Sequence, residues 1–209
     1  TVVNLFYLLM QIVIATEDEP LGTGGAIRHA LPYLESGTDE SVLIFKGDVL
    51  TGVDIRSLVD YHATTSSDVT IYLTPVEDPR AYGLVPTDQA GRVLAFLEKP
   101  TTEEEIVTNN INAGCYVFKR SIIDAIPGGR PVSVERETFP GLLAAGALVT
   151  AVVDKGYWLD LGTPLSFVQG SCDLVLGAAP SPAVPRHGDF LALPGADIAP
   201  TAQVHGGSV

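Results

Sequence analysis

The chain alternates between short apolar runs and amphipathic stretches over most of its length. Several apolar runs, rich in Val, Ile, Leu and Phe, continue without a polar interruption, a pattern typical of strands covered on both faces. An amphipathic helix would instead repeat its apolar side chains every three or four residues. The predicted strands are residues 11–15, 42–45, 69–74, 84–86, 93–97, 111–118, 149–153 and 157–159.

Helical patterns fall between these runs. Residues 26–34 and 55–62 each place apolar side chains on one helical face, and Asp54 precedes the second stretch in the position of an N-cap. Residues 135–145 and 164–176 follow a similar pattern. Helices that alternate with buried strands predict an α/β layered domain with a largely parallel sheet.

The composition changes after residue 176. Residues 177–185 are rich in Pro, Gly and Ala, which predicts a semi-rigid linker that we extend to 177–190. Beyond it, Ile198 and Val204 are six residues apart, the repeat length of a hexapeptide β-helix. We therefore expect a domain at 1–176 and the beginning of a β-helix at 191–209; with only two repeats, a chance pattern is the alternative.

The composition and the net charge of the chain limit the kinds of partner and the cell compartment that we expect for it. The chain has 209 residues, of which 46% are hydrophobic and 18% charged, enough for one full core. Its net charge of −13 predicts that it does not bind nucleic acid. Two cysteines without metal-ligand spacing, and an apolar opening too short to span a membrane, predict a cytoplasmic protein without a membrane partner.

Candidate chemistry lies at the ends of predicted strands. Asp48 follows the strand at 42–45 and Asp160 follows the strand at 157–159; if the two carboxylates converge, they would suit Mg²⁺. Glu98 and Lys99 adjoin at a third strand end, where they could bind a sugar hydroxyl and a phosphate. Taken singly, each could equally be a turn or surface residue.

The motifs occur in an order that resembles the sugar-1-phosphate nucleotidyltransferase family. The resemblance covers residues 16–209 and is nearest to the mannose-1-phosphate guanylyltransferase branch. It implies a Rossmann-like nucleotide-diphospho-sugar transferase fold, continued by a left-handed β-helix. The motifs are Glu-Pro-Leu-Gly-Thr-Gly-Gly at 19–25, Gly-Asp at 47–48, Tyr-Gly at 82–83, Phe-Leu-Glu-Lys-Pro at 96–100, Ile-Asn-Ala-Gly at 111–114 and Trp-Leu-Asp-Leu-Gly at 158–162.

The same resemblance implies nucleotidyl transfer from a nucleoside triphosphate, GTP favoured, to a sugar-1-phosphate, mannose-1-phosphate favoured. The products would be a nucleotide-sugar and pyrophosphate. Asp48, Lys99 and Asp160 would be catalytic. The resemblance implies that Leu21, Gly22 and Thr23 contact the base through backbone groups and that Gly25 makes a further substrate contact. It implies that Gly83, Glu98 and Asn112 bind the sugar and that Lys99 binds the sugar phosphate. Asp48 and Asp160 would be the Mg²⁺ ligands.

Two departures from the family pattern leave alternatives open. The family's opening loop, of the form GxGTRLxPL, does not occur in these residues, so we expect an N-terminally truncated catalytic domain. An alternative is that this chain by itself is inactive for want of that loop. Lys46 also stands where the family more often has an uncharged residue. The alternatives are a glucose-1-phosphate enzyme of the same family and a non-catalytic nucleotide-sugar sensor or assembly subunit. A homo-oligomer would form through the β-helix.

Overall fold

The computed structural model describes residues 12–34, 40–100, 102–182, 188–192 and 194–207. The chain divides into two compact units: unit 1 comprises Thr1–Lys46 and Asp54–Lys155, and unit 2 comprises Gly47–Val53 and Gly156–Val209. The boundaries expected at residues 176 and 190 stay predictions.

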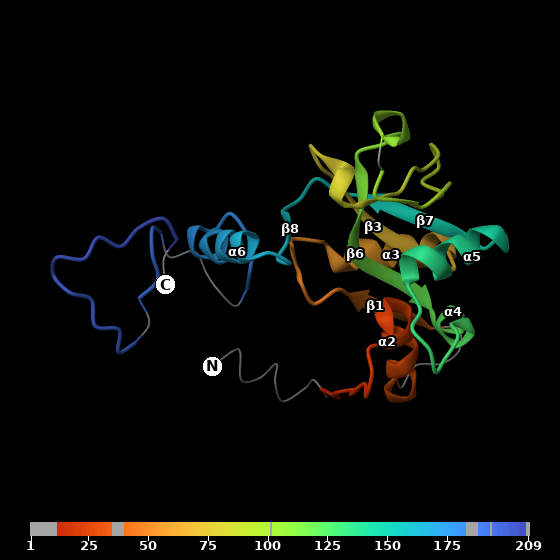
Figure 1. Cartoon of the computed structure of the whole chain (residues 1–209), viewed down its shortest axis with the longest axis horizontal. Helices are drawn as coiled ribbons and strands as arrows, with labels where there is room; N and C mark the ends of the chain where they lie inside the picture. The colour runs from red at the N-terminus through yellow and green to blue at the C-terminus, as the bar shows by residue number, and fades with distance from the viewer. Residues whose placement is uncertain (1–11, 35–39, 101, 183–187, 193, 208–209) are drawn as a thin grey trace. The chain divides into compact units, whose positions relative to one another are not determined.

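Unit 1 is built on a six-stranded mixed sheet (Figure 1). The longest strand, β6, pairs with β3 along one side; on its other side it pairs with β4 near its start and with β1 near its end. β5 pairs with β4, and β7 pairs with β3. The strands are β1 (Ser41–Phe45), β3 (Val69–Pro75), β4 (Gly83–Leu84), β5 (Leu97–Glu98), β6 (Asn110–Lys119) and β7 (Val149–Val153).

Helices cover both faces of this sheet. Thr70 of β3 points toward α3, so its neighbours Val69 and Ile71 point to the opposite face. On that face Ile123 of α4 and Phe139 of α5 join them in the core. The helices of unit 1 are α2 (Gly22–Ala30), α3 (Ile55–Thr65), α4 (Arg120–Ala125) and α5 (Phe139–Ala144), with the 3₁₀ turns η1 (Leu31–Tyr33), η2 (Pro79–Ala81) and η3 (Glu103–Glu105) and the π-helical turn η4 (Val134–Thr138).

Aromatic rings fill the centre of the core. The Phe139 ring stacks on Phe96 with centroids 4.6 Å apart, and it meets Tyr116 at 5.3 Å and Phe118 at 5.9 Å. Tyr116 and Phe118 alternate with Val117 along β6, so they project from the same face of the sheet. The burial of these rings holds β6 against α5 and stabilises the sheet, which carries the candidate sugar-binding residues.

The described part of unit 2 contains a two-stranded antiparallel sheet and one helix. β2 (Val49–Thr51) pairs with β8 (Trp158–Asp160), and α6 (Pro164–Leu176) follows. The Thr163 side chain accepts a hydrogen bond from the Ser166 amide and thus caps α6, which ends at left-handed Gly177. The described residues between 191 and 207 form turns and contain no strand. Among the helices that the structure describes, none is long and apolar enough to cross a membrane.

Two expectations from the sequence are wrong. The sheet is not largely parallel: of the described strand pairs, only β3–β7 is parallel. A strand that is buried on both faces has a continuous apolar run whether its neighbours are parallel or antiparallel. The apolar run of β6 therefore did not indicate that its pairing is antiparallel. Residues 12–15 of the strand expected at 11–15 form no strand, and Gln11 lies outside the described residues.

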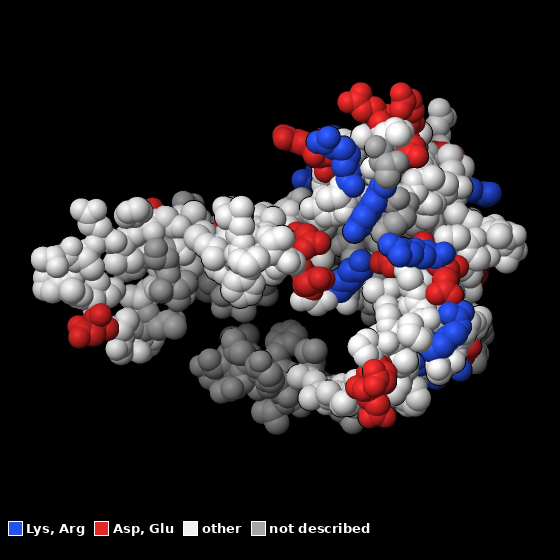
Figure 2. Space-filling view, in the orientation of Figure 1, with Lys and Arg blue, Asp and Glu red and all other residues white. Residues whose placement is uncertain are grey.

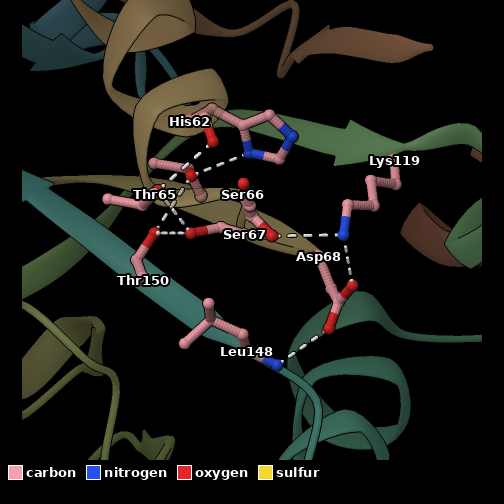
Figure 3. Close-up of polar contacts among 9 residues, drawn as sticks. His62, Thr65, Ser66, Ser67, Asp68, Lys119, Leu148 and Thr150 are labelled. Atoms are coloured by element: carbon pink, nitrogen blue, oxygen red, sulfur yellow. Dashed lines mark hydrogen bonds and ion pairs between the residues drawn. The ribbon is translucent and has the colours of Figure 1, made fainter. Parts of the chain in front are cut away.

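A buried polar network lies between α3, β3 and β7 (Figure 3). The His62 Nδ1 lies 2.8 Å from the Thr70 hydroxyl, which lies 3.0 Å from the Thr150 hydroxyl. Thr150 in turn lies 2.8 Å from the Ser67 hydroxyl. All four residues are buried, so each polar group depends on its protein partners rather than on water.

Beside this network, Asp68 joins β6 to β7. Its carboxylate accepts from the Lys119 ammonium and from the Leu148 amide, both at 2.8 Å (Figure 3). Burial alone would raise the pKa of Asp68, but these hydrogen bonds and the Lys119 charge hold the pKa below its ordinary value.

The burial of His62 makes the stability of unit 1 depend on pH. Burial, assisted by the Lys119 charge and opposed by Asp68, lowers the pKa of His62 from its ordinary value of 6.5. Protonation therefore favours the unfolded chain, and this contribution to stability is complete above pH 6.5 and is lost as the pH falls below it. We expect the free energy of unfolding, measured with urea, to fall as the pH is lowered below 6.5.

The variant His62→Gln tests the origin of this slope. Gln does not titrate, and it can still hydrogen-bond Thr70, so the slope should flatten even if overall stability changes. The same slope in wild type and variant would assign the pH dependence to other groups.

Candidate functional site

The structure brings three of the predicted sugar residues together. Gly83 of β4 lies directly opposite Glu98 of β5, and Leu84 lies opposite both Leu97 of β5 and Ile111 of β6. Asn112 is the next residue on β6. Three consecutive strands of the chain thus place Gly83, Glu98 and Asn112 side by side in the sheet.

Asn112 belongs to a β-bulge. The register of β3 against β6 shifts between Ile71 and Leu73, and Gly114 adopts a φ of +79° at that point. The Asn112 side chain accepts from the Gly114 amide at 3.2 Å and donates to the Tyr116 hydroxyl at 2.8 Å. The side chain predicted to read a sugar hydroxyl is therefore already oriented by the strand that carries it.

Lys99 has an unusual backbone conformation. Its φ is +41°, in the left-handed region that residues other than Gly seldom adopt, and its side chain is exposed. Such strain costs roughly 1–3 kcal/mol and is found preferentially at functional sites. An exposed cation next to Glu98, held in a strained turn, is consistent with the predicted phosphate contact.

The glycine-rich segment 20–25 packs tightly against the chain around Val132. The Gly24 and Gly25 amides donate to the Val132 carbonyl at 2.8 and 3.3 Å, and the Val132 amide donates to Leu21 at 2.8 Å. Gly22 has a φ of +69°, and a Cβ there would lie 2.7 Å from the Val132 carbonyl oxygen. Close packing therefore requires these glycines, independently of any ligand.

Leu21 and Gly25 also line a small hollow. It has a volume of 260 Å³, and Arg28, His29, Pro32 and the Gly128–Gly129 turn complete its wall. A separate, mostly apolar cavity of 290 Å³ between α4 and α5 contains none of the predicted site residues. Of the three residues predicted for the base pocket, only Leu21 lines this hollow, so the position of a base pocket stays a prediction.

A polar cluster that the sequence did not indicate lies beside Thr23. The Glu135 carboxylate accepts from the Thr23 hydroxyl at 3.0 Å and meets the Lys46 ammonium at 2.8 Å. Burial alone would raise the pKa of Glu135, but Lys46 and Thr23 outweigh it and keep the pKa below its ordinary value. In the sequence, the only sign of a role for Glu135 is that this acid follows the apolar Val134. Many surface helices have an acid next to an apolar residue, so the sign is not specific.

The two predicted metal ligands lie together in unit 2. Asp160 is opposite Val49, and the Leu161 amide donates to the Asp48 carbonyl at 2.8 Å. The Asp160 Oδ1 accepts from the Gly162 amide at 2.7 Å. The backbone of the two residues is therefore adjacent, whereas the convergence of their carboxylates on one metal stays a prediction. The described residues contain no cluster of three or more His, Cys, Asp or Glu fit for a metal.

Charges are mixed on the viewed face of the molecule (Figure 2). Lys and Arg lie among Asp and Glu over the body that contains β3, β6 and β7, and they form no continuous basic stripe on this face. The expectation that nucleic acid is not a partner stays a prediction.

Comparison with known proteins identifies the family. The nucleotidyl transferase family matches residues 4–175, most of the chain. The chain belongs to this family. It is 52% identical over 202 residues to a mannose-1-phosphate guanylyltransferase of Mycobacterium tuberculosis, and the match covers 96% of this chain and 55% of that protein. It is 36% identical over 163 residues to mannose-1-phosphate guanylyltransferase catalytic subunit beta of Drosophila melanogaster, covering 78% of this chain and 42% of that protein.

This nucleotidyl transferase chain thus spans about half the length of these relatives. Among solved structures, HddC from Yersinia pseudotuberculosis matches with a TM-score of 0.61 and 29% identity, covering 73% of this chain and 62% of that one. A structure of HddC complexed with GMP-PN matches with a TM-score of 0.60 over the same shares of the two chains. A putative glucose-1-phosphate thymidylyltransferase from Bacillus anthracis, TM-score 0.61 at 20% identity, covers 73% of this chain and 61% of its own and shares the fold. The expected family and its α/β nucleotidyltransferase fold are confirmed.

Replacing Gly114 should destabilise the nucleotidyl transferase unit. Gly114→Ala would put a side chain at a φ of +79° and within 3.1–3.3 Å of the Lys46 stem. We expect the free energy of unfolding in urea to fall by about 1–3 kcal/mol. Gly128→Ala is the matched control, since an added Cβ there meets nothing within 4 Å. Equal midpoints for the two variants would contradict the assigned bulge.

Proposed function

We propose that the complete protein is a mannose-1-phosphate guanylyltransferase, which converts GTP and mannose-1-phosphate into GDP-mannose and pyrophosphate. The observation that carries this proposal is the 52% identity to a protein of that name across 96% of this chain. The adjacency of Gly83, Glu98 and Asn112 on three neighbouring strands supports a sugar site there.

The reaction needs no protein nucleophile. An oxygen of the sugar phosphate attacks the α-phosphorus of the triphosphate, the new P–O bond forms in line, and the bond to pyrophosphate breaks. Catalysis of this kind depends on positioning two anions and neutralising their charge. Lys99 supplies a cation for the sugar phosphate, Leu21, Gly22 and Thr23 form the base pocket, and Gly25 makes a further substrate contact.

Magnesium is the metal that best suits the acidic pair. Asp48 and Asp160 offer hard oxygen ligands, and Mg²⁺ commonly takes one or two carboxylates and completes its octahedron with phosphate oxygens and water. The Gly162 amide holds one oxygen of Asp160 in place, which supports a preset ligand. When bound, the metal would neutralise charge on the reacting phosphates.

We also propose that the C-terminal residues begin a left-handed β-helix. Ile198 and Val204 keep the hexapeptide spacing, and Ile198 is 43% exposed in this chain. A solenoid coil buries such side chains only against further coils, so additional repeats would cover Ile198. We propose that this helix also provides the surface for a homo-oligomer and that the protein, with Cys115 and Cys172 unpaired, works in the reducing cytoplasm.

The proposal is tested by assaying the complete gene product for pyrophosphate release. GTP with mannose-1-phosphate and Mg²⁺ should give the highest kcat/KM among GTP, ATP, UTP and dTTP paired with mannose-1-phosphate or glucose-1-phosphate. A preference for glucose-1-phosphate would favour the alternative of a glucose-1-phosphate nucleotidyltransferase of the same family. Binding of GDP-mannose without turnover would favour a sensor or assembly subunit.

Removing either proposed metal ligand should abolish most turnover. In Asp48→Asn and Asp160→Asn, one carboxylate is replaced by a weaker neutral ligand, so we expect kcat to fall on the order of 10²-fold and half-saturation to need more Mg²⁺. Asp197→Asn, at an exposed acid of the same unit, is the control and should behave as wild type. Wild-type Mg²⁺ dependence in either site variant would remove that residue from the metal site.

Loss of the Lys99 charge should act mainly on one substrate. We expect Lys99→Ala to raise the KM for mannose-1-phosphate about 10-fold with a much smaller effect on the KM for GTP. Arg56→Ala removes an exposed cation from α3 and serves as the control. A KM for mannose-1-phosphate equal to that of wild type would refute the phosphate contact.

A further inference from the structure

We propose that the ion pair between Lys46 and Glu135 is a positioning device that fixes the glycine-rich segment 20–25 relative to the bulge of β6. We call Thr23, Lys46, Gly114 and Glu135 the Lys46 clasp. The inference rests on the proposed function, because the two segments that the clasp joins are those expected to contact the base and the sugar.

Glu135 forms the connection to the glycine segment. Its Oε2 accepts from the Thr23 hydroxyl at 3.0 Å and from the Ser133 hydroxyl at 3.2 Å. The Thr23 hydroxyl oxygen also accepts from the Val134 amide at 2.9 Å. Thr23, in the first turn of α2, is therefore held by both its donor and its acceptor functions to the turn that carries Glu135.

Lys46 forms the connection to β6. Its amide donates to the Gly114 carbonyl at 2.8 Å, which extends the β1–β6 pairing by one residue. Its side-chain carbons occupy the space that Gly114 leaves open, since a Cβ on Gly114 would lie 3.1–3.3 Å from them. The stem thus lies over the glycine of the Asn112 bulge, and the ammonium ends 2.8 Å from the Glu135 Oε1.

Burial separates this pair from an ordinary surface ion pair. The Lys46 and Glu135 side chains are 36% and 17% exposed, whereas Arg130 and Glu137, paired at the same 2.8 Å in the same region, are 49% and 44% exposed. Water and salt screen the half-shielded pair less, so its two charges attract each other more strongly than those of an exposed pair. Glu135 also lies in a π-helical turn, a conformation that occurs frequently at functional sites.

A pair that only stabilised the fold would change stability and leave substrate affinity unchanged. A positioning pair would instead alter the alignment of both substrate segments. Because these segments are expected to hold the base and the sugar and not the reacting atoms, a shift in them should weaken the binding of both substrates more than it slows the chemical step. The two roles therefore predict different kinetic results in variants that remain folded.

The kinetic test compares Lys46→Met, Glu135→Gln and Lys46→Arg in the complete gene product. We expect the first two to raise the KM for GTP and for mannose-1-phosphate about 10-fold, with kcat within about 3-fold of wild type. Lys46→Arg keeps the stem and the charge, so it should restore both KM values. Glu137→Gln breaks the exposed pair and should leave them unchanged.

The outcomes separate the alternatives. A lower thermal midpoint with wild-type KM values, or the same KM change in Glu137→Gln, would overturn the positioning role. If Glu135→Gln does not fold, the contrast between Lys46→Met and Lys46→Arg still decides. Equal KM values in those two variants would also overturn the proposal.

Hydrogen exchange tests the clasp without substrates. In Lys46→Met the amides of residues 22–25 and 112–114 should exchange faster than in wild type, while those of β7 should not change. Faster exchange at both segments in a protein without guanylyltransferase activity would retain the clasp and reject the proposed function. Unchanged exchange at these segments would reject the clasp.

Discussion

The pairing of β6 with strands on both sides constrains the rest of unit 1. β6 is long and buried on both faces, so its backbone groups must bond to β1, β3 and β4 and its side chains must pack against both helical layers. The bulge at Gly114 interrupts this regular pairing at one point. That interruption orients Asn112 and leaves the space in which the Lys46 side chain lies.

The charge balance explains why individual cations matter in this molecule. With 12 basic and 25 acidic residues, the chain repels anionic substrates on average, and each local cation must offset nearby carboxylates as well as meet a ligand. Lys99 is exposed in a strained turn, whereas Lys46 is paired with Glu135. The exposed Lys99 is suited to contact a phosphate, whereas the paired Lys46 is suited to hold two chain segments together.

Local patterns predicted several elements closely. The strand expected at 149–153 and the helix expected at 164–176 have the observed bounds, because apolar runs and the Thr163–Pro164 start are local signals. The helix expected at 135–145 is divided into η4 and α5, and strands expected at 84–86 and 93–97 are reduced to the short β4 and β5. Neither β2 nor α4 was predicted, since short elements formed by tertiary pairing leave little periodicity.

By itself, the sequence determined the family, because the order and the residue types of its motifs can be recognised without knowing any contact in space. It also identified Gly83, Glu98 and Asn112 as candidates for one site. Only the tertiary structure decided that β6 runs antiparallel to β1 and β3, because burial fixes which side chains are apolar but not the direction of the strand. It alone revealed the partnership of Lys46 with Glu135, since an ion pair depends on a distance in space, and these residues are far apart along the chain.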